Sequence, residues 1–273
     1  MKVMAAAAKA NARDLFRRGQ LVELPNSGDV LVTGDLHGHL ANFKRIVRIA
    51  DLPHHPQRHL ILQEVLHAMY EDTPDTSYRL LEEVAILKTV YPSQVHIILA
   101  NHDLAELLGH DILKKGRSVL RAFDAVLEEA YQFNKDVIRK AYLAFLRTLP
   151  WAAATPTGIF RSHSLPDRRY LDLFSRDLFT QDYATPDLSK TSPPFRLVWG
   201  RDLSAGTAAD FAQRVGADLL IIGHHPCRNG HVEPNPHTII LDSKDAHGAC
   251  LALPLDTPLS HSEAVARIRY LNF

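Results

Sequence analysis

Cysteine is scarce in this sequence of 273 residues. Its two cysteines, Cys227 and Cys250, are too few for a disulfide framework, and neither has a cysteine neighbour at metal-ligand spacing. Long apolar runs are also missing, so we expect no membrane-spanning helix. The Ala-rich start soon continues into Asn, Arg and Asp, and we interpret it as a first helix rather than a signal peptide. These absences favour a cytoplasmic protein in a reducing compartment.

Neither sign of charge dominates. Lys plus Arg and Asp plus Glu number 31 each, so no net field attracts nucleic acid or an acidic membrane surface. We therefore expect no nucleic-acid partner and no membrane partner. The number of histidines is unusual, with 16 copies, and imidazole suits metal binding and proton transfer near neutral pH.

Apolar periodicity predicts strands that alternate with helices in a single domain over residues 1–273. We expect a helical N-terminal extension over 5–19, a core over about 28–255 and a helical insertion over about 111–149. Short apolar runs predict the strands, among them "DVLVTGD", "VHIILA", "GIFRS", "FRLVWGRD" and "ADLLIIGHH". This order indicates an α/β protein with sheets in the middle and helices outside.

The stretch "RHLILQEVLHAMY", residues 58–70, fits two structures. As a helix, it would make Glu64 a solvated surface charge. As a strand over 58–62, it would place Glu64 and His67 in a loop at the rim of a sheet. The stretch alone does not decide between these interpretations.

Four apolar runs end in a short polar cluster: "VTGDLHGH", "IILANHD", "IFRSHS" and "IIGHHP". One such cluster is typical of a turn with its cap. Several of them indicate a common site, because ligands of open α/β sheets bind where strands end. Carboxylates, amide carbonyls and imidazoles form the mixed set that suits Mn, Fe or Zn in pairs.

The ordered motifs "GDLHGHL", "ANHDLAEL", "SHSLP" and "GHHP" resemble those of the calcineurin-like metallophosphoesterases. The likeness is to the phosphoprotein phosphatase branch, which also contains symmetrical diadenosine tetraphosphate hydrolases, and it covers Val30 to about Gly230. It implies a four-layer α/β/β/α sandwich with two central mixed sheets. The family motif Gly-Asp-x-x-Asp-Arg-Gly is absent here. In its place "LILQEVLHAM" aligns Gln63 with the glycine, Glu64 with the bridging aspartate, His67 with the second aspartate and Ala68 with the arginine. This alignment favours the strand interpretation of residues 58–62.

The resemblance implies hydrolysis at two divalent metal ions, by attack of a hydroxide that both ions bind. Manganese is the expected metal, with Fe, Zn or Co as alternatives. Glu64 would be shared between the two ions. The expected ligands are Asp35, His37 and Glu64 on the first ion and Glu64, Asn101, His163 and His224 on the second.

His102 would be the general acid that protonates the leaving group. In the family an aspartate orients this histidine, and His67 takes its place here. Either another acid such as Asp103 or Glu71 orients His102, or protonation of the leaving group is weak. The missing arginine removes a clamp for the substrate phosphate, and Arg201, next to a Trp-containing strand end, is expected to supply one. The other candidates for this clamp are Arg161 and Arg228.

Three functions fit this pattern. The first is a phosphatase that acts on phosphorylated small molecules or on phosphoprotein. The second is hydrolysis of dinucleoside polyphosphates or other nucleotides at the same site. The third is a non-catalytic homologue that binds metal or a phosphorylated ligand, which the loss of the Asp-Arg pair favours. The retained ligand motifs favour an enzyme.

Overall fold

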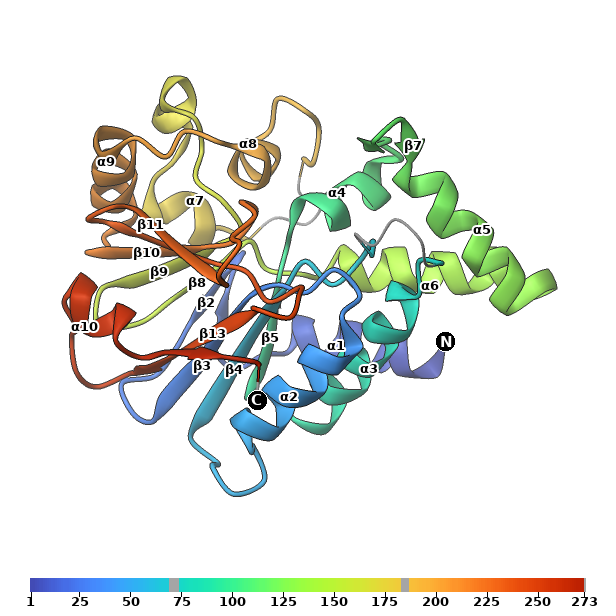
Figure 1. Ribbon diagram of the computed structural model, residues 1–273, viewed down its shortest axis with the longest axis horizontal. Helices are drawn as coiled ribbons and strands as arrows, with labels where there is room; N and C mark the ends of the chain where they lie inside the picture. The colour runs from blue at the N-terminus through green and yellow to red at the C-terminus, as the bar shows by residue number, and fades with distance from the viewer. Residues whose placement is uncertain (69–73, 183–186, 273) are drawn as a thin grey trace.

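Two mixed sheets lie face to face at the centre of the computed structural model, which describes residues 1–68, 74–182 and 187–272 (Figure 1). The seven-stranded sheet contains, in spatial order, β1 (Arg17–Arg18), β2 (Leu21–Glu23), β8 (Ala152–Ala154), β9 (Ile159–Ser162), β10 (Leu219–Ile222), β12 (Thr238–Leu241) and β11 (His231–Asn235). The five-stranded sheet contains β14 (Ile268–Tyr270), β13 (Ala249–Pro254), β3 (Asp29–Asp35), β4 (Arg58–Gln63) and β5 (Val95–Ile98). Strands β3, β4 and β5 are parallel, as are β9, β10 and β12.

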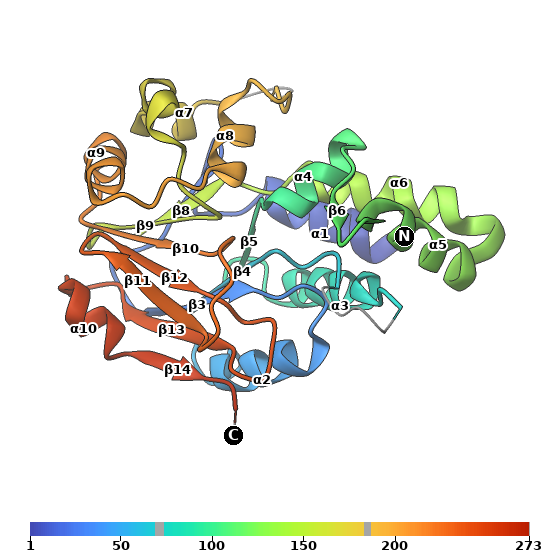
Figure 2. The same ribbon diagram turned by 45° about the horizontal axis from the view of Figure 1, so that its top comes forward.

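Helices cover the outer faces of both sheets. On the five-stranded side lie α2 (Leu40–Ala50) and α3 (Ser77–Val90), with α1 (Lys2–Ala12) against α3. On the seven-stranded side lie α7 (Arg176–Thr180), α8 (Pro193–Trp199), α9 (Ala205–Val215) and the 3-10 helix η2 (Arg168–Leu173). Helices α2 and α9 therefore lie on opposite sides of the paired sheets (Figure 2). The short α10 (His261–Val265) contacts β12 and β13.

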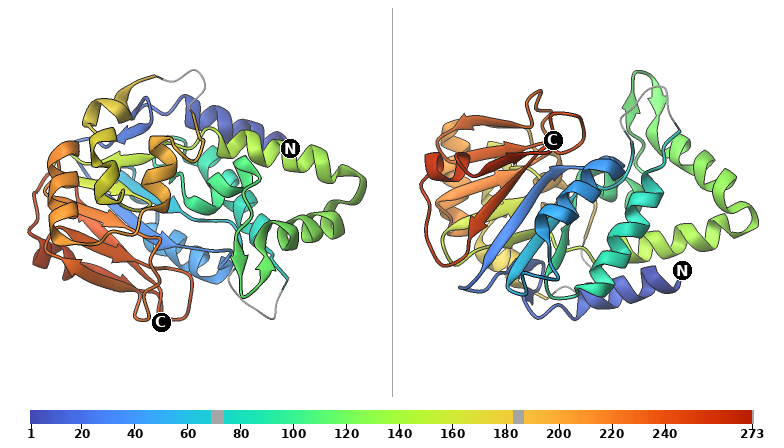
Figure 3. Two further views of the ribbon diagram at one scale, coloured as in Figure 1. Left: turned by 90° about the horizontal axis from the view of Figure 1, so that it is seen from above. Right: turned by 60° about the horizontal axis from the view of Figure 1, so that its bottom comes forward.

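A helical hairpin projects from the sheets (Figure 3). It consists of α5 (Val119–Tyr131), η1 (Gln132–Asn134) and α6 (Lys135–Leu146). A two-stranded ribbon, β6 (Leu113–Lys114) with β7 (Arg117–Ser118), connects it to α4 (Asn101–Leu108). Among the described residues, no helix has the length and apolar character needed to cross a membrane.

Side chains along the strands alternate between two apolar layers, as the pleat requires. Val32, Ile61 and Ile221 belong to a cluster that both sheets share. Leu60 and Leu62, their neighbours on β4, pack into the layer beneath the helices instead. The order helix, sheet, sheet, helix follows, and the predicted four-layer α/β/β/α sandwich is confirmed.

The strand over residues 58–62 is also confirmed, since β4 spans Arg58–Gln63. The strand predicted for "FRLVWGRD" is wrong, because Phe195–Trp199 belong to α8. Pro193 and Pro194 lie in its first turn, where a missing N–H costs no hydrogen bond. The N-terminal helix ends at Ala12 rather than at residue 19. The helix ends before Asp14, whose carboxylate pairs with the buried Lys88 at 2.7 Å.

Candidate metal centre

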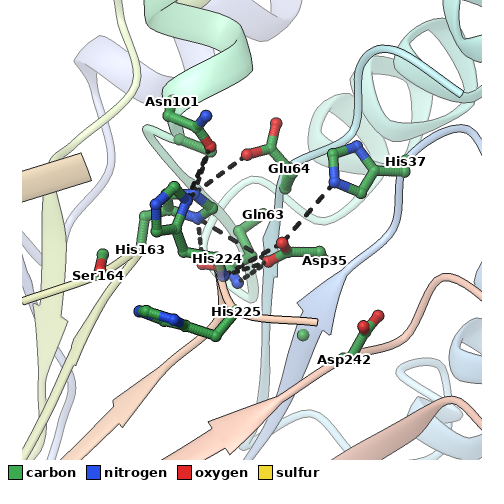
Figure 4. A network of polar contacts seen from close by, with 12 residues as sticks. Asp35, His37, Gln63, Glu64, Asn101, His163, Ser164, His224, His225 and Asp242 are labelled. Atoms are coloured by element: carbon green, nitrogen blue, oxygen red, sulfur yellow. Dashed lines mark hydrogen bonds and ion pairs between the residues drawn. The ribbon is translucent and has the colours of Figure 1, made fainter. Parts of the chain in front are cut away.

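The polar clusters at the strand ends meet at one place (Figure 4). Asp35 is the last residue of β3, Glu64 follows β4, and Asn101 begins α4 after β5. His163 and His224 follow β9 and β10 of the other sheet. Because the strands of each set are parallel, their carboxyl ends lie at a common edge, where ligands of α/β proteins bind.

Turns with unusual backbone aim three of the predicted ligands into this place. His37, Glu64 and His224 have φ angles of 41°, 47° and 66°, in the left-handed region that costs a non-glycine residue about 1 kcal/mol or more. The backbone N–H of His37 donates to the Glu64 carbonyl at 2.7 Å, which ties the turn after β3 to the turn after β4. Strain of this kind persists where the surroundings hold it, and it concentrates at functional sites.

Four candidate ligand atoms lie close together. His163 Nε2 lies 2.7 Å from Asn101 Oδ1, 3.1 Å from Glu64 Oε2 and 3.2 Å from His224 Nδ1. His224 Nδ1 is also 3.2 Å from Asn101 Oδ1. Within the described chain, both carboxylate oxygens of Glu64 are buried and accept no hydrogen bond. An ionised carboxylate without hydrogen bonds is stable in the interior only beside a cation, so these atoms fit a divalent metal ion.

Glu64 also belongs to the group predicted for the first ion. One atom each of Asp35, Glu64 and His163 lies within 4.8 Å of the others, and the same is true of His37, Glu64 and His102. His37 Nε2 is 3.8 Å from Asp35 Oδ2. The Nδ1 of His37 lies 3.0 Å from the carbonyl of His67, so Nδ1 carries the hydrogen and Nε2 is left to face Asp35.

Burial shifts the pKa values of these groups. It raises the pKa of Glu64 to about 8 and that of Asp35 to about 6, where Glu64 and Asp242 add to the effect. It lowers the pKa of His163 to about 4 and that of His224 well below its ordinary value. The histidines are thereby held in the neutral form that binds metal. The carboxylates, in contrast, need a cation next to them to be ionised.

His102 lies beside this cluster, and Asp103, one of the acids expected to orient it, makes its contact elsewhere. Asp103 Oδ2 accepts a hydrogen bond of 3.0 Å from the backbone N–H of Ala100 at the start of α4. Glu71 lies outside the described residues. The ring of His102 contacts His67 instead, with 2.8 Å between their Nδ1 atoms.

Glu106, which the sequence analysis missed, lies behind His67. Its Oε1 is 3.0 Å from His67 Nε2. Helical spacing could have indicated Glu106 from the sequence. Glu106 follows His102 by one turn of α4, so the two residues lie on the same face of the helix.

Gln63, which the sequence analysis aligned with the family glycine, has a role that was not predicted. Its amide donates to Asp35 Oδ1 at 2.8 Å, and its Oε1 lies 3.4 Å from His163 Nδ1, so it touches a candidate ligand on each sheet. Gly223 makes room for this arrangement, because a Cβ there would overlap the side chains of Gln63 and Asp35. No motif indicated either role.

The predicted arginine clamps occupy different environments. Arg201 is exposed, and its backbone N–H donates to Asp167 at 2.9 Å. Its charge adds to burial in lowering the pKa of His224, so its guanidinium acts on the site from the rim. Arg161 is 2% exposed and donates to the carbonyls of Thr33 and Ile221, one on each sheet. It therefore holds the two sheets together and does not face a substrate.

The four-layer fold, with candidate oxygen and nitrogen ligands gathered at the strand ends of its two sheets, is that of a metallophosphoesterase. A family model described as calcineurin-like phosphoesterase matches residues 28–228, and the chain belongs to this family. Its members are hydrolases of phosphoesters, as the family description states.

Individual relatives are distant. The chain is 24% identical over 224 residues to a probable serine/threonine-protein phosphatase of Encephalitozoon cuniculi (strain GB-M1). The match covers 77% of this chain but 45% of that relative, so the chain spans about half of its length. Among solved structures, a Saccharomyces cerevisiae serine/threonine phosphatase with similarity to human PP5 matches at a TM-score of 0.73 and 14% identity, covering 100% of this chain and 93% of that one. A cold-active protein-tyrosine phosphatase of a Shewanella species matches at a TM-score of 0.59 and 13% identity, over 96% and 84% of the two chains.

Proposed function

We propose that this chain is a dinuclear metal-dependent phosphatase that hydrolyses phosphomonoesters, with phosphoserine and phosphothreonine of proteins among its substrates. The observation that carries the proposal is the convergence of Glu64, Asn101 and His224 on His163 Nε2, within 3.2 Å. The family and the phosphatase names of its relatives support the substrate class.

Each ligand has a role in this proposal. Asp35 and His37 would hold the first ion, Asn101, His163 and His224 would hold the second, and Glu64 would serve both. The chemistry that such ions would supply is a lowered pKa of a water molecule and neutralisation of phosphoryl oxygens. The mixed oxygen and nitrogen set accepts Mn, and also Fe, Zn or Co. Gln63 keeps Asp35 and His163 in register across the two sheets.

The substrate meets two further groups. His102 protonates the oxygen of the departing alcohol or phenol. Arg201 attracts the phosphate from the rim of the site. It takes over the role of the family arginine, whose position is occupied by Ala68 in this chain. Because Arg201 is exposed, it contributes to KM more than to kcat.

The test is hydrolysis of p-nitrophenyl phosphate by protein stripped of metal with a chelator, before and after addition of Mn²⁺. We expect turnover only after the addition. D35N should abolish it, while D256N, a change at an exposed aspartate, should not. Failure of Mn, Co, Ni, Zn and Fe alike to restore turnover would refute the phosphatase and favour a non-catalytic metal-binding protein.

A second comparison concerns the substrate class. The restored enzyme is supplied with a phosphoserine peptide and, separately, with diadenosine tetraphosphate. We expect the peptide to be hydrolysed with the higher kcat/KM, since a phosphomonoester requires no site for a nucleoside. A preference for diadenosine tetraphosphate would leave the proposed metal centre standing. It would show that the substrate is a nucleotide anhydride rather than a phosphomonoester.

A further inference from the structure

We propose that His67, Glu106 and Arg139 form a positioning chain for His102, in which a carboxylate acts on the catalytic imidazole through a second imidazole. This inference rests on the proposed function, because it names the residues that prepare His102 to protonate the leaving group. The chain of contacts joins the turn after β4 to helices α4 and α6.

Hydrogen bonds connect the four side chains in a single line. His102 Nδ1 lies 2.8 Å from His67 Nδ1, and His67 Nε2 lies 3.0 Å from Glu106 Oε1. The other carboxylate oxygen of Glu106 accepts a hydrogen bond of 2.6 Å from Arg139. His67 is 0% exposed, and His102 and Glu106 are each 3% exposed. Bulk water therefore does not compete for these contacts, and the arginine balances the buried carboxylate.

The carboxylate determines which ring nitrogens carry hydrogen. Glu106 paired with Arg139 can only accept, so His67 Nε2 donates to it and the Nδ1 of a neutral His67 is an acceptor. His102 then donates from Nδ1, which leaves Nε2 as the atom that meets the substrate. The ring of His37 packs edge-on against His102, with centroids 5.0 Å apart at 76°. Contacts with His37 and His67 therefore fix both the tautomer and the orientation of the His102 ring.

The helical hairpin holds the far end of this chain of contacts. Phe123 of α5 packs edge-on against His67, with centroids 5.2 Å apart at 73°. Arg139 of α6 also donates to Asp124 of α5 at 3.0 Å. The hairpin, which the sequence predicted only as an insertion, therefore supplies the apolar wall and the cation that keep Glu106 and His67 in place.

In the proposed reaction, His102 enters the step as an imidazolium with hydrogen on both ring nitrogens. The bond between phosphorus and the leaving oxygen breaks, that oxygen takes the Nε2 proton, and His102 becomes a neutral ring that keeps its hydrogen on Nδ1. Water forms the new bond from oxygen to phosphorus and loses one proton, which returns to Nε2 of His102. Glu106, acting through His67, holds Nε2 in line with the leaving oxygen. A leaving group that is a weak base needs little protonation, so it should be the least sensitive to loss of Glu106.

The experiment compares two substrates of the Mn²⁺-loaded enzyme: p-nitrophenyl phosphate, with a good leaving group, and phenyl phosphate, with a poor one. We expect E106Q to lower kcat for phenyl phosphate by about 100-fold and kcat for p-nitrophenyl phosphate by less than about 10-fold, with KM unchanged. E129Q, a change at an exposed glutamate of α5, should alter neither. Adding H67D to E106Q places a carboxylate directly beside His102 and should restore the ratio, since aspartate tolerates the φ of 60° at this position.

Imidazole ¹⁵N NMR of the metal-free protein is the second readout, and it does not depend on turnover. It should show hydrogen on Nδ1 of His102 and on Nε2 of His67, and E106Q should shift the His67 nitrogens. Equal losses for both substrates, or a neutral His102 ring that carries its hydrogen on Nε2, would overturn the inference. A wild-type enzyme without turnover would refute the proposed function instead, while the NMR result would still decide whether the tautomers are as assigned.

Discussion

Glu64 Oε2 lies 3.1 Å from His163 Nε2, and this contact joins the end of β4 in one sheet to the end of β9 in the other. Both side chains are fully buried, at 0% exposure. No hydrogen bond compensates the carboxylate within the described chain. A cation bound at this junction would compensate the buried carboxylate, so metal binding should raise the free energy of unfolding.

Replacing Glu64 with glutamine tests this linkage. E64Q removes a buried carboxyl group whose ionisation is opposed by burial, which raises its pKa to about 8. The metal-free protein should therefore gain about 2 kcal/mol in free energy of unfolding at neutral pH. The same change should lower the metal content from two ions per chain to one or none. Urea denaturation with and without Mn²⁺, together with metal analysis by mass spectrometry, measures both effects.

E83Q provides the matched control, because Glu83 is an exposed residue of α3. It should retain two ions and the stabilisation that Mn²⁺ gives to the wild type. If E64Q retained two ions as well, Glu64 would not be a shared ligand, and the assignment of the turn after β4 would fail.

Gln63 should matter although it is not a proposed ligand. It donates to Asp35 Oδ1 at 2.8 Å and approaches His163 Nδ1 at 3.4 Å. Q63M keeps the volume but removes both polar contacts, and loss of such a supporting residue typically weakens metal affinity by about 10–100-fold. Titration with Mn²⁺, followed by calorimetry, measures the affinity. Q213M, at an exposed position of α9, should bind as the wild type does, and equal affinity in Q63M would show that the two ligands need no support.

Much of the fold was predictable because apolar runs and polar strand ends have local signatures. The runs containing Val32, Ile61 and Ile221 form parallel strands, and the clusters after them meet at one edge of the sheets. The strand over 58–62 required the context of the neighbouring motifs, since its own pattern also fits a helix. Once β4 was placed, Glu64 followed as a residue of the turn.

What escaped prediction depends on contacts between distant segments. Glu106 acts on His102 through His67, which follows a different strand, and Arg139 reaches Glu106 from α6. Asp103, an acid that the sequence offered, is next to His102 in the chain, but its Oδ2 accepts a hydrogen bond from the backbone of Ala100 at the start of α4. Helical spacing predicts which face of α4 carries Glu106. Which side chains that face contacts depends on tertiary packing.

Gly223 should be intolerant of any side chain. A Cβ at this position would overlap Gln63 and Asp35, so G223A should cost about 1–3 kcal/mol in free energy of unfolding and should displace Asp35 from the metal. Thermal unfolding and Mn²⁺ titration measure the two effects. G206A is the control, because the atom nearest to its Cβ, at 3.2 Å, is the flexible end of Arg168. Alanine in helix α9 should raise stability by about 0.5–1 kcal/mol, and similar behaviour of the two variants would contradict the close packing at Gly223.

Acid should weaken the protein through His59, away from the metal centre. Burial, helped by the neighbouring His96, lowers the pKa of His59 to about 4. Below the ordinary value of about 6.5, the unfolded chain binds a proton that the folded chain refuses, so stability falls as the pH drops towards 4. Between about pH 7.5 and pH 4.5 this one residue should remove about 2–3 kcal/mol from the free energy of unfolding. Urea denaturation across this range should therefore show a shallower pH dependence for H59N than for the wild type. H55N, at an exposed histidine, should follow the wild type, and parallel curves for all three proteins would exclude His59 as the source.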